Sequence, residues 1–158
     1  MARRFEEFQK RDVALLGLSV DSVYSHLAWI DSIKKTFDIE IPFPVIADLD
    51  LRIARSYGMV SHNPSTATVR SVFFIDPDLT VRATLAYPAA IGRNIDELLR
   101  VFDAFQENTV SGGCAIPANW RPGQPTLSPA PDSSDGLRRR WQDANRPGYK
   151  NWYYNVNE

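Results

Sequence analysis

Apolar and polar residues follow one another along this chain in blocks that predict the element order β–α–β–α–β–β–α. The clearest block covers residues 69–88, where two apolar runs flank Asp76-Pro77-Asp78. This pattern predicts a β-hairpin with a tight turn at the Asp-Pro-Asp sequence. Residues 72–75 of the first run are all apolar, so both faces of that strand need to be covered. We therefore expect a central strand of a sheet.

The part of the chain before the hairpin predicts two β–α units. Residues 13–20 form a continuous apolar run, which is typical of a strand buried in a parallel sheet. Asp21 and Ser22 can cap a helix whose apolar residues recur at helical spacing as far as Phe37. A short strand at 44–48 and a short helix at 49–57, ended by Gly58, repeat the pattern.

Three further segments complete the predicted domain. Residues 1–10 resemble the last turns of an amphipathic helix that has no N-cap. Residues 61–68 are polar and predict a loop that leads into the hairpin. After the hairpin, Asn94 begins a closing helix with one apolar face. We expect a partial domain over residues 1–108.

The composition changes from Thr109 onward, because six of the eleven prolines and three of the four tryptophans lie in the last fifty residues. Proline favours an extended backbone, and scattered tryptophan and tyrosine side chains need apolar surface to cover them. The pattern predicts that residues 109–158 are an extended C-terminal arm that packs on another surface.

Charge and cysteine content exclude several classes of function. The 158 residues carry a formal net charge of −1, so no field attracts nucleic acid or an anionic membrane. The longest apolar run is far shorter than a membrane span, and no apolar signal segment opens the chain. The one cysteine, Cys114, rules out an intrachain disulfide and favours a cytoplasmic protein. We expect neither nucleic acid nor membrane as a partner.

The predicted order is that of an α/β protein with a thioredoxin-like sheet, in which helices cover both faces. The start of the pattern differs, because Met1 falls inside a predicted helix whose capped beginning the chain does not contain. We therefore expect a thioredoxin-like fold that lacks its N-terminal strands.

Several segments, taken in order, closely resemble the peroxiredoxins of the 1-Cys type. The resemblance runs from about Phe8 to about Pro122, and the arm together with Gly92-Arg93-Asn94 favours the 1-Cys subclass. The matching segments are Leu18-Ser19-Val20-Asp21-Ser22-Val23, His26-Leu27-Ala28-Trp29, Pro42-Phe43-Pro44-Val45-Ile46-Ala47-Asp48, Arg70-Ser71-Val72-Phe73-Phe74-Ile75-Asp76-Pro77, Tyr87-Pro88-Ala89, Asp96-Glu97-Leu98-Leu99-Arg100 and Pro117-Ala118-Asn119-Trp120-Arg121-Pro122-Gly123.

The resemblance implies a thiol peroxidase that reduces hydrogen peroxide or an organic hydroperoxide and is recycled by an external thiol. It implies no cofactor, and it implies a homodimer joined by the arm. Arg70 matches the arginine that lowers the thiolate pKa in this family and orients the peroxide. The motif Pro-x-x-x-Thr-x-x-Cys, which carries the attacking cysteine, is absent from the 158 residues. Cys114 lies near the place where 2-Cys relatives keep a resolving cysteine.

Each candidate residue also has a structural interpretation. Arg70 could form a surface salt bridge, although the surrounding motif favours catalysis. Arg93 could pair with Asp96 or Glu97, and this is as well supported as a supporting role at the active site. Cys114 is more simply an inert loop thiol than a redox partner. His26 fits packing or an interface, and with His62 it gives too few ligands for a zinc site, so no metal is expected. Arg138-Arg139-Arg140 is more typical of a solvated helix face than of nucleic-acid binding.

Two hypotheses of function follow. The first is a 1-Cys-type peroxiredoxin whose chain is incomplete at the N-terminus. The second is a short, non-catalytic peroxiredoxin-like module that survives through binding or dimer formation. The DNA upstream of the Met1 codon discriminates them, because an in-frame Pro-x-x-x-Thr-x-x-Cys supports the first hypothesis and an in-frame stop supports the second.

Overall fold

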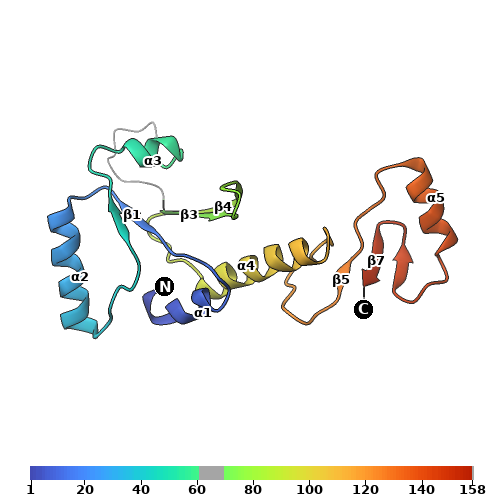
Figure 1. Ribbon diagram of the computed structural model, residues 1–158, viewed down its shortest axis with the longest axis horizontal. Coiled ribbons are helices and arrows are strands. Elements are labelled where there is room, and N and C mark those ends of the chain that lie inside the picture. Colours follow the sequence, from blue (N-terminus) through green and yellow to red (C-terminus); the bar gives the residue numbers. More distant parts are fainter. Residues whose placement is uncertain (61–69, 158) are drawn as a thin grey trace. The chain divides into compact units, whose positions relative to one another are not determined.

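A computed structural model describes residues 1–60 and 70–157 of the chain (Figure 1). The chain divides into two units, Met1–Ile95 and Asp96–Glu158, and each is described by itself. The predicted loop at 61–68, which contains His62, and Val69 lie outside the described residues. The sequence-based division into residues 1–108 and 109–158 stays a prediction.

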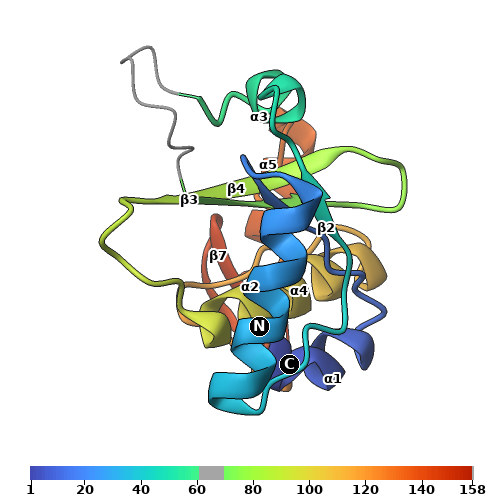
Figure 2. The same cartoon turned by 90° about the vertical axis from the view of Figure 1, so that its left-hand side faces the viewer.

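The first unit contains the predicted β–α–β unit. Strands β1 (Gly17–Ser19) and β2 (Val45–Ala47) pair in parallel, with Leu18 opposite Ile46. Helix α2 (Val23–Phe37) connects them and contacts β2 (Figure 2). Ser22 caps α2 as predicted, because its hydroxyl oxygen accepts a hydrogen bond from the Ser25 amide at 3.1 Å.

The strand predicted over residues 13–20 is shorter than expected. Only Gly17–Ser19 forms β1, and the side chain of Leu16 just before it is 64% exposed. A continuous apolar run gives no boundary between paired and unpaired residues, so the sequence overestimated the length. Among the described residues β1 pairs with β2 alone and β3 pairs with β4 alone. The prediction of two central strands is therefore not met in this part of the chain, where each strand has one paired edge.

The predicted hairpin is present in the first unit (Figure 2). Strand β3 (Arg70–Ile75) pairs in antiparallel fashion with β4 (Val81–Tyr87), and Arg70 lies opposite Tyr87. The loop between them is longer than the expected Asp-Pro-Asp turn. It spans residues 76–80, and Asp76 closes it by exchanging backbone and side-chain hydrogen bonds with Thr80. Leu79 adopts a positive φ of 62° in this loop.

The short helices of the first unit are η1 (Ala2–Arg4), α1 (Phe5–Gln9) and α3 (Arg52–Ser56). Phe8 of α1 and Phe74 of β3 are two of the most deeply buried side chains in the described chain. Helix α3 starts later than the predicted residue 49, because Leu51 at its N-cap takes a left-handed conformation with φ of 61°. The leucine side chain has no acceptor for the free amides at the start of α3, so another residue supplies the cap.

Helix α4 (Ile95–Val110) is the predicted closing helix, and all of it except Ile95 belongs to the second unit. The unit continues with β5 (Thr126–Leu127), α5 (Ser134–Gln142), β6 (Tyr149–Asn151) and β7 (Tyr154–Asn157). These strands form an antiparallel sheet in the order β5-β7-β6. The prediction that the arm is extended is wrong in this respect, because the arm contains a capped helix and a small sheet.

Two residues determine local structure in the second unit. Trp120 is buried, and its indole N–H donates a hydrogen bond to the Gln124 carbonyl at 2.8 Å. Gly148, just before β6, has φ of 83°, and a Cβ atom there would lie 2.4 Å from the carbonyl oxygen of Val156. None of the helices in the described chain is long and apolar enough to span a bilayer.

Candidate functional site

Arg70 and Arg93 form the arrangement in the first unit that can carry chemistry. Arg70 is the first residue of β3, and its Nη1 donates a long hydrogen bond of 3.4 Å to the Ile91 carbonyl. Arg93 follows that carbonyl by two residues, and its Nη2 donates to the Ser71 carbonyl at 3.2 Å. The two side chains therefore cross between the start of β3 and the loop after β4. This reciprocal pairing brings both predicted arginines together.

The electrostatics of this pair are those of two like charges. Partial desolvation, followed by the repulsion from Arg70, lowers the pKa of the Arg93 guanidinium, and Tyr87 opposes this effect. The guanidinium of Arg93 nevertheless stays protonated near neutral pH, because an arginine pKa starts far above it. The pair is thus a concentrated positive charge at one end of the hairpin.

The alternative interpretation of Arg93 as a partner of Glu97 is not supported. The carboxylate of Glu97 forms a paired contact with the guanidinium of Arg100, at 2.7 and 2.8 Å. This hydrogen bond, ahead of an opposing effect of burial, lowers the pKa of Glu97. Across residues 1–60 and 70–157, Arg93 makes no ion pair with a carboxylate.

Cys114 lies in the second unit and is shielded from solvent. Its side chain is free of any disulfide and the residue is 2% exposed. The backbone around it is also engaged, because Asn108 Nδ2 donates to the Cys114 carbonyl at 2.7 Å and the Cys114 amide donates to Ser111 Oγ at 3.2 Å. A buried thiol is poorly accessible to peroxide or to a second thiol. This environment favours the structural interpretation of Cys114.

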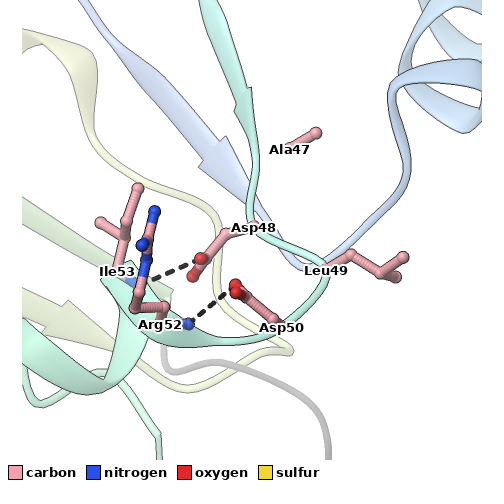
Figure 3. A pocket seen from close by; sticks show the side chains of 6 residues that line it. All are labelled: Ala47, Asp48, Leu49, Asp50, Arg52 and Ile53. Carbon is pink, nitrogen blue, oxygen red and sulfur yellow. Dashed lines mark hydrogen bonds between the residues drawn. The ribbon is translucent and has the colours of Figure 1, made fainter.

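A shallow depression of about 420 Å³ in the first unit is lined by residues 47–50 together with Arg52 and Ile53 (Figure 3). Asp48, one of its two carboxylates, is 2% exposed and accepts hydrogen bonds from the amides of Ile53 at 3.0 Å and Ala54 at 2.7 Å. Burial opposes ionisation of Asp48, but these amide bonds outweigh it and lower the carboxyl pKa. Asp48 is therefore the missing cap of α3, and its oxygens are already used.

His26 also has a structural role that the sequence did not specify. It is 7% exposed on α2, and its Nε2 lies 2.5 Å from Ser19 Oγ at the end of β1. Serine and histidine seven residues apart form no recognised motif, so this bond could not be predicted from the sequence. The bond connects α2 to β1, in agreement with the packing interpretation of His26.

Two other features of the described chain bear on function. No cluster of histidine, cysteine and carboxylate side chains among the described residues could hold a metal ion. A groove of about 430 Å³ in the second unit lies between α4 and residues 116–118. It is lined mainly by apolar side chains, with Arg100 and Asn108 at polar positions. Both of these polar side chains already bond within the unit, to Glu97 and to the Cys114 carbonyl.

Comparison with family models gives two matches. Residues 1–84 match the AhpC/TSA family, and residues 104–143 match the C-terminal domain of 1-Cys peroxiredoxin. Among curated proteins, a peroxiredoxin of Thermoplasma volcanium is 51% identical over 150 residues, which cover 95% of this chain and 71% of the relative. Peroxiredoxin 2 of Thermoplasma acidophilum is also 51% identical, with coverage of 95% and 73%.

Comparison with solved structures gives the same kind of neighbour. A yeast mitochondrial 1-Cys peroxiredoxin, studied for thiol resolution by the glutathione and thioredoxin systems, matches with a TM-score of 0.80 and 35% identity, covering 98% of this chain and 75% of that one. A cysteine-to-serine mutant of peroxiredoxin 6 from Arenicola marina matches with a TM-score of 0.76 and 30% identity, covering 98% and 74%. These similarities confirm the predicted thioredoxin-like α/β fold.

Proposed function

Because this chain belongs to the peroxiredoxin family, we propose that Arg70 and Arg93 are the residues that position the peroxide and the attacking thiolate in its reaction. The protein is an oxidoreductase of the thiol peroxidase class, with a peroxide as substrate and a thiol as reductant. The reciprocal bonding of the two arginines is the observation that carries the proposal.

The reduction of a peroxide by a thiolate needs positive charge at two stages. The thiolate sulfur attacks one peroxide oxygen, an S–O bond forms, and the O–O bond breaks with its electron pair on the departing oxygen. That oxygen takes up a proton and leaves as water or an alcohol, and the sulfur remains as a sulfenic acid. Guanidinium groups stabilise the thiolate before attack and the departing oxygen during it. An external thiol then condenses with the sulfenic acid to give a mixed disulfide and water, and a second thiol reduces that disulfide and regenerates the cysteine thiol.

Cys114 is not the attacking thiol in this proposal, because it is buried and its position is that of a loop cysteine after α4. The attacking thiol is then a residue outside these 158, since the chain holds one cysteine. Translation of the DNA upstream of the Met1 codon tests this directly. An in-frame Pro-x-x-x-Thr-x-x-Cys supports the proposal, and an in-frame stop supports the non-catalytic module instead.

The role of the arginines is tested in the gene product that contains both that cysteine and these residues. Arg70→Gln should lower kcat/KM for hydrogen peroxide by about 10²–10³, the usual effect of removing a donor that stabilises developing charge. Arg82→Gln on the same hairpin is the matched control, because Arg82 pairs with Asp76 instead. Equal activity of Arg70→Gln and Arg82→Gln would refute the role of Arg70.

A homodimer and a cytoplasmic location complete the proposal. Four aromatic side chains of the second unit are exposed, and exposed aromatic side chains are frequent anchors of protein interfaces. A two-fold dimer would cover the same side chains in both copies. The single cysteine agrees with a reducing compartment. The exposed aromatics of the second unit are Trp141, Trp152, Tyr153 and Tyr154.

A further inference from the structure

The positive charge of Arg70 and Arg93 has no carboxylate to balance it within residues 1–60 and 70–157. Both side chains bond main-chain carbonyl oxygens, which carry partial charge only. Each guanidinium presents several N–H donors in a planar fork, and each of these two uses one of them. Most of the donors of the pair therefore remain available to a ligand.

Two other arginines of the first unit, Arg82 and Arg4, differ from this pair. Arg82, on the same hairpin, lies 3.4 Å from the carboxylate of Asp76. Arg4 in η1 makes an ion pair with Glu7 one turn later. Arg82 and Arg4 are therefore compensated by carboxylates, whereas Arg70 and Arg93 place two charges, uncompensated within the described chain, close enough to repel each other.

We propose that Arg70 and Arg93 together bind a small oxyanion, either a carboxylate or a tetrahedral inorganic anion, through donors from both guanidinium groups. Two planar forks match ligands that offer two or more acceptor oxygens, and such contacts are stronger than those to neutral acceptors. This inference deepens the proposed function, since the same pair is assigned to the peroxide there. It predicts that oxyanions compete with the peroxide, whereas chloride at equal ionic strength does not.

The electrostatics agree with this ligand. The lowered pKa of Arg93 reflects partial desolvation and the repulsion from Arg70. A bound anion relieves that repulsion and supplies hydrogen bonds to the partly desolvated donors. A neutral peroxide supplies the hydrogen bonds but leaves the repulsion between the two cations in place. The pair is therefore better matched to an anion than to an uncharged ligand.

The experiment is a titration of the 158-residue protein, followed by the ¹H–¹⁵N resonances of the arginine Nε–H groups. Sodium sulfate and sodium acetate are the probes, and sodium chloride at matched ionic strength is the reference. Sulfate raises protein stability in general, so side-chain resonances are a cleaner measure than thermal stability. We expect saturable shifts confined to Arg70 and Arg93. Saturation by sulfate alone assigns a tetrahedral anion, and saturation by acetate assigns a carboxylate.

Three variants make the result decisive. Arg70→Gln and Arg93→Gln should each weaken binding roughly tenfold or more, because each removes charged hydrogen bonds. Arg82→Gln should bind as the parent does. Absence of saturation with both probes overturns the proposal, and so does binding that persists in Arg70→Gln and Arg93→Gln. Since no turnover is measured, failure here leaves the peroxidase test of Arg70→Gln unaffected, and the two outcomes are separable.

Discussion

The hairpin end of the first unit and the turn after α4 in the second unit hold the two kinds of group that thiol peroxidase chemistry uses. At the hairpin end, Arg70 and Arg93 are fixed by main-chain carbonyls and keep free donors. After α4, Cys114 is enclosed with its backbone bonded to Asn108 and Ser111. Residue type alone therefore does not identify a reactive group, because the accessibility of the side chain also decides it. The charged pair is available for a ligand, and the sulfur is not.

The largest expected effect concerns the sulfur. The 158-residue protein should consume hydrogen peroxide, with a dithiol as reductant, no faster than a free thiol does, because Cys114 is buried. Cys114→Ser should leave this slow rate unchanged. Rapid turnover that disappears in Cys114→Ser would contradict the assignment of Cys114 as an inaccessible thiol, because it would make Cys114 the nucleophile.

The next effect concerns association through the second unit. Removal of residues 117–158 should weaken the dimer of the complete protein more than it disturbs residues 13–108. Trp152→Ala should raise the dimer dissociation constant by about 30-fold, the effect of losing one aromatic anchor. Val110→Ala is the matched control, since Val110 is an exposed apolar residue at the end of α4. Analytical ultracentrifugation measures both, and equal dissociation constants for the two variants would exclude Trp152 from the interface.

A smaller effect is expected at Asp48, whose charged form the amides of α3 stabilise. Because its folded pKa is lowered, its contribution to stability is present above the unfolded pKa of about 3.9 and is lost as the pH falls through the folded pKa. Asp48→Asn should therefore lower Tm by a few degrees at pH 7. The difference from the parent should shrink on acidification below about pH 3.9. A difference that grows on acidification would contradict this assignment.

The smallest effects concern the N-caps of one helix in each unit. Ser22 Oγ accepts from the Ser25 amide and Ser133 Oγ accepts from the Gly136 amide, both at 3.1 Å. Ser22→Ala and Ser133→Ala should each lower the free energy of unfolding by about 1 kcal/mol. Ser22→Thr and Ser133→Thr retain the hydroxyl and should lose less. Denaturant titration with a fixed slope measures all four, and an unchanged midpoint for an alanine variant would show that its cap is not stabilising.

The elements that the sequence predicted well are those with strong local signals. The cap at Ser22 and the helical spacing after it placed α2, and the two apolar runs around Asp76-Pro77 placed the hairpin. The sheet of the second unit was missed because proline content was given more weight than short strands such as β7, which pairs locally with β6 but also with the distant β5. The length of β1 was overestimated because an apolar run does not show where pairing stops.

The candidate site was predictable in its residues but not in its geometry. Arg70 and Arg93 came from a family resemblance, and the sequence offered Asp96 or Glu97 as the partner of Arg93. Arg93 instead uses a carbonyl of the first unit, at Ser71. A main-chain acceptor is present at every residue, so residue identity cannot reveal which one a side chain will choose. The capping role of Asp48 was hidden for a related reason, because Leu51 occupies the position where a cap is normally sought.

Gly148 has a consequence for which sequences can encode this protein. Its positive φ is one that other residues rarely adopt, and the carbonyl of Val156 occupies the space that any Cβ would need. The obstacle is backbone, so no change of rotamer removes it. A library of all substitutions at this position should therefore return glycine alone after selection for folded protein. The three-residue strand β6 therefore depends on the codon of a residue that lies just before it, Gly148.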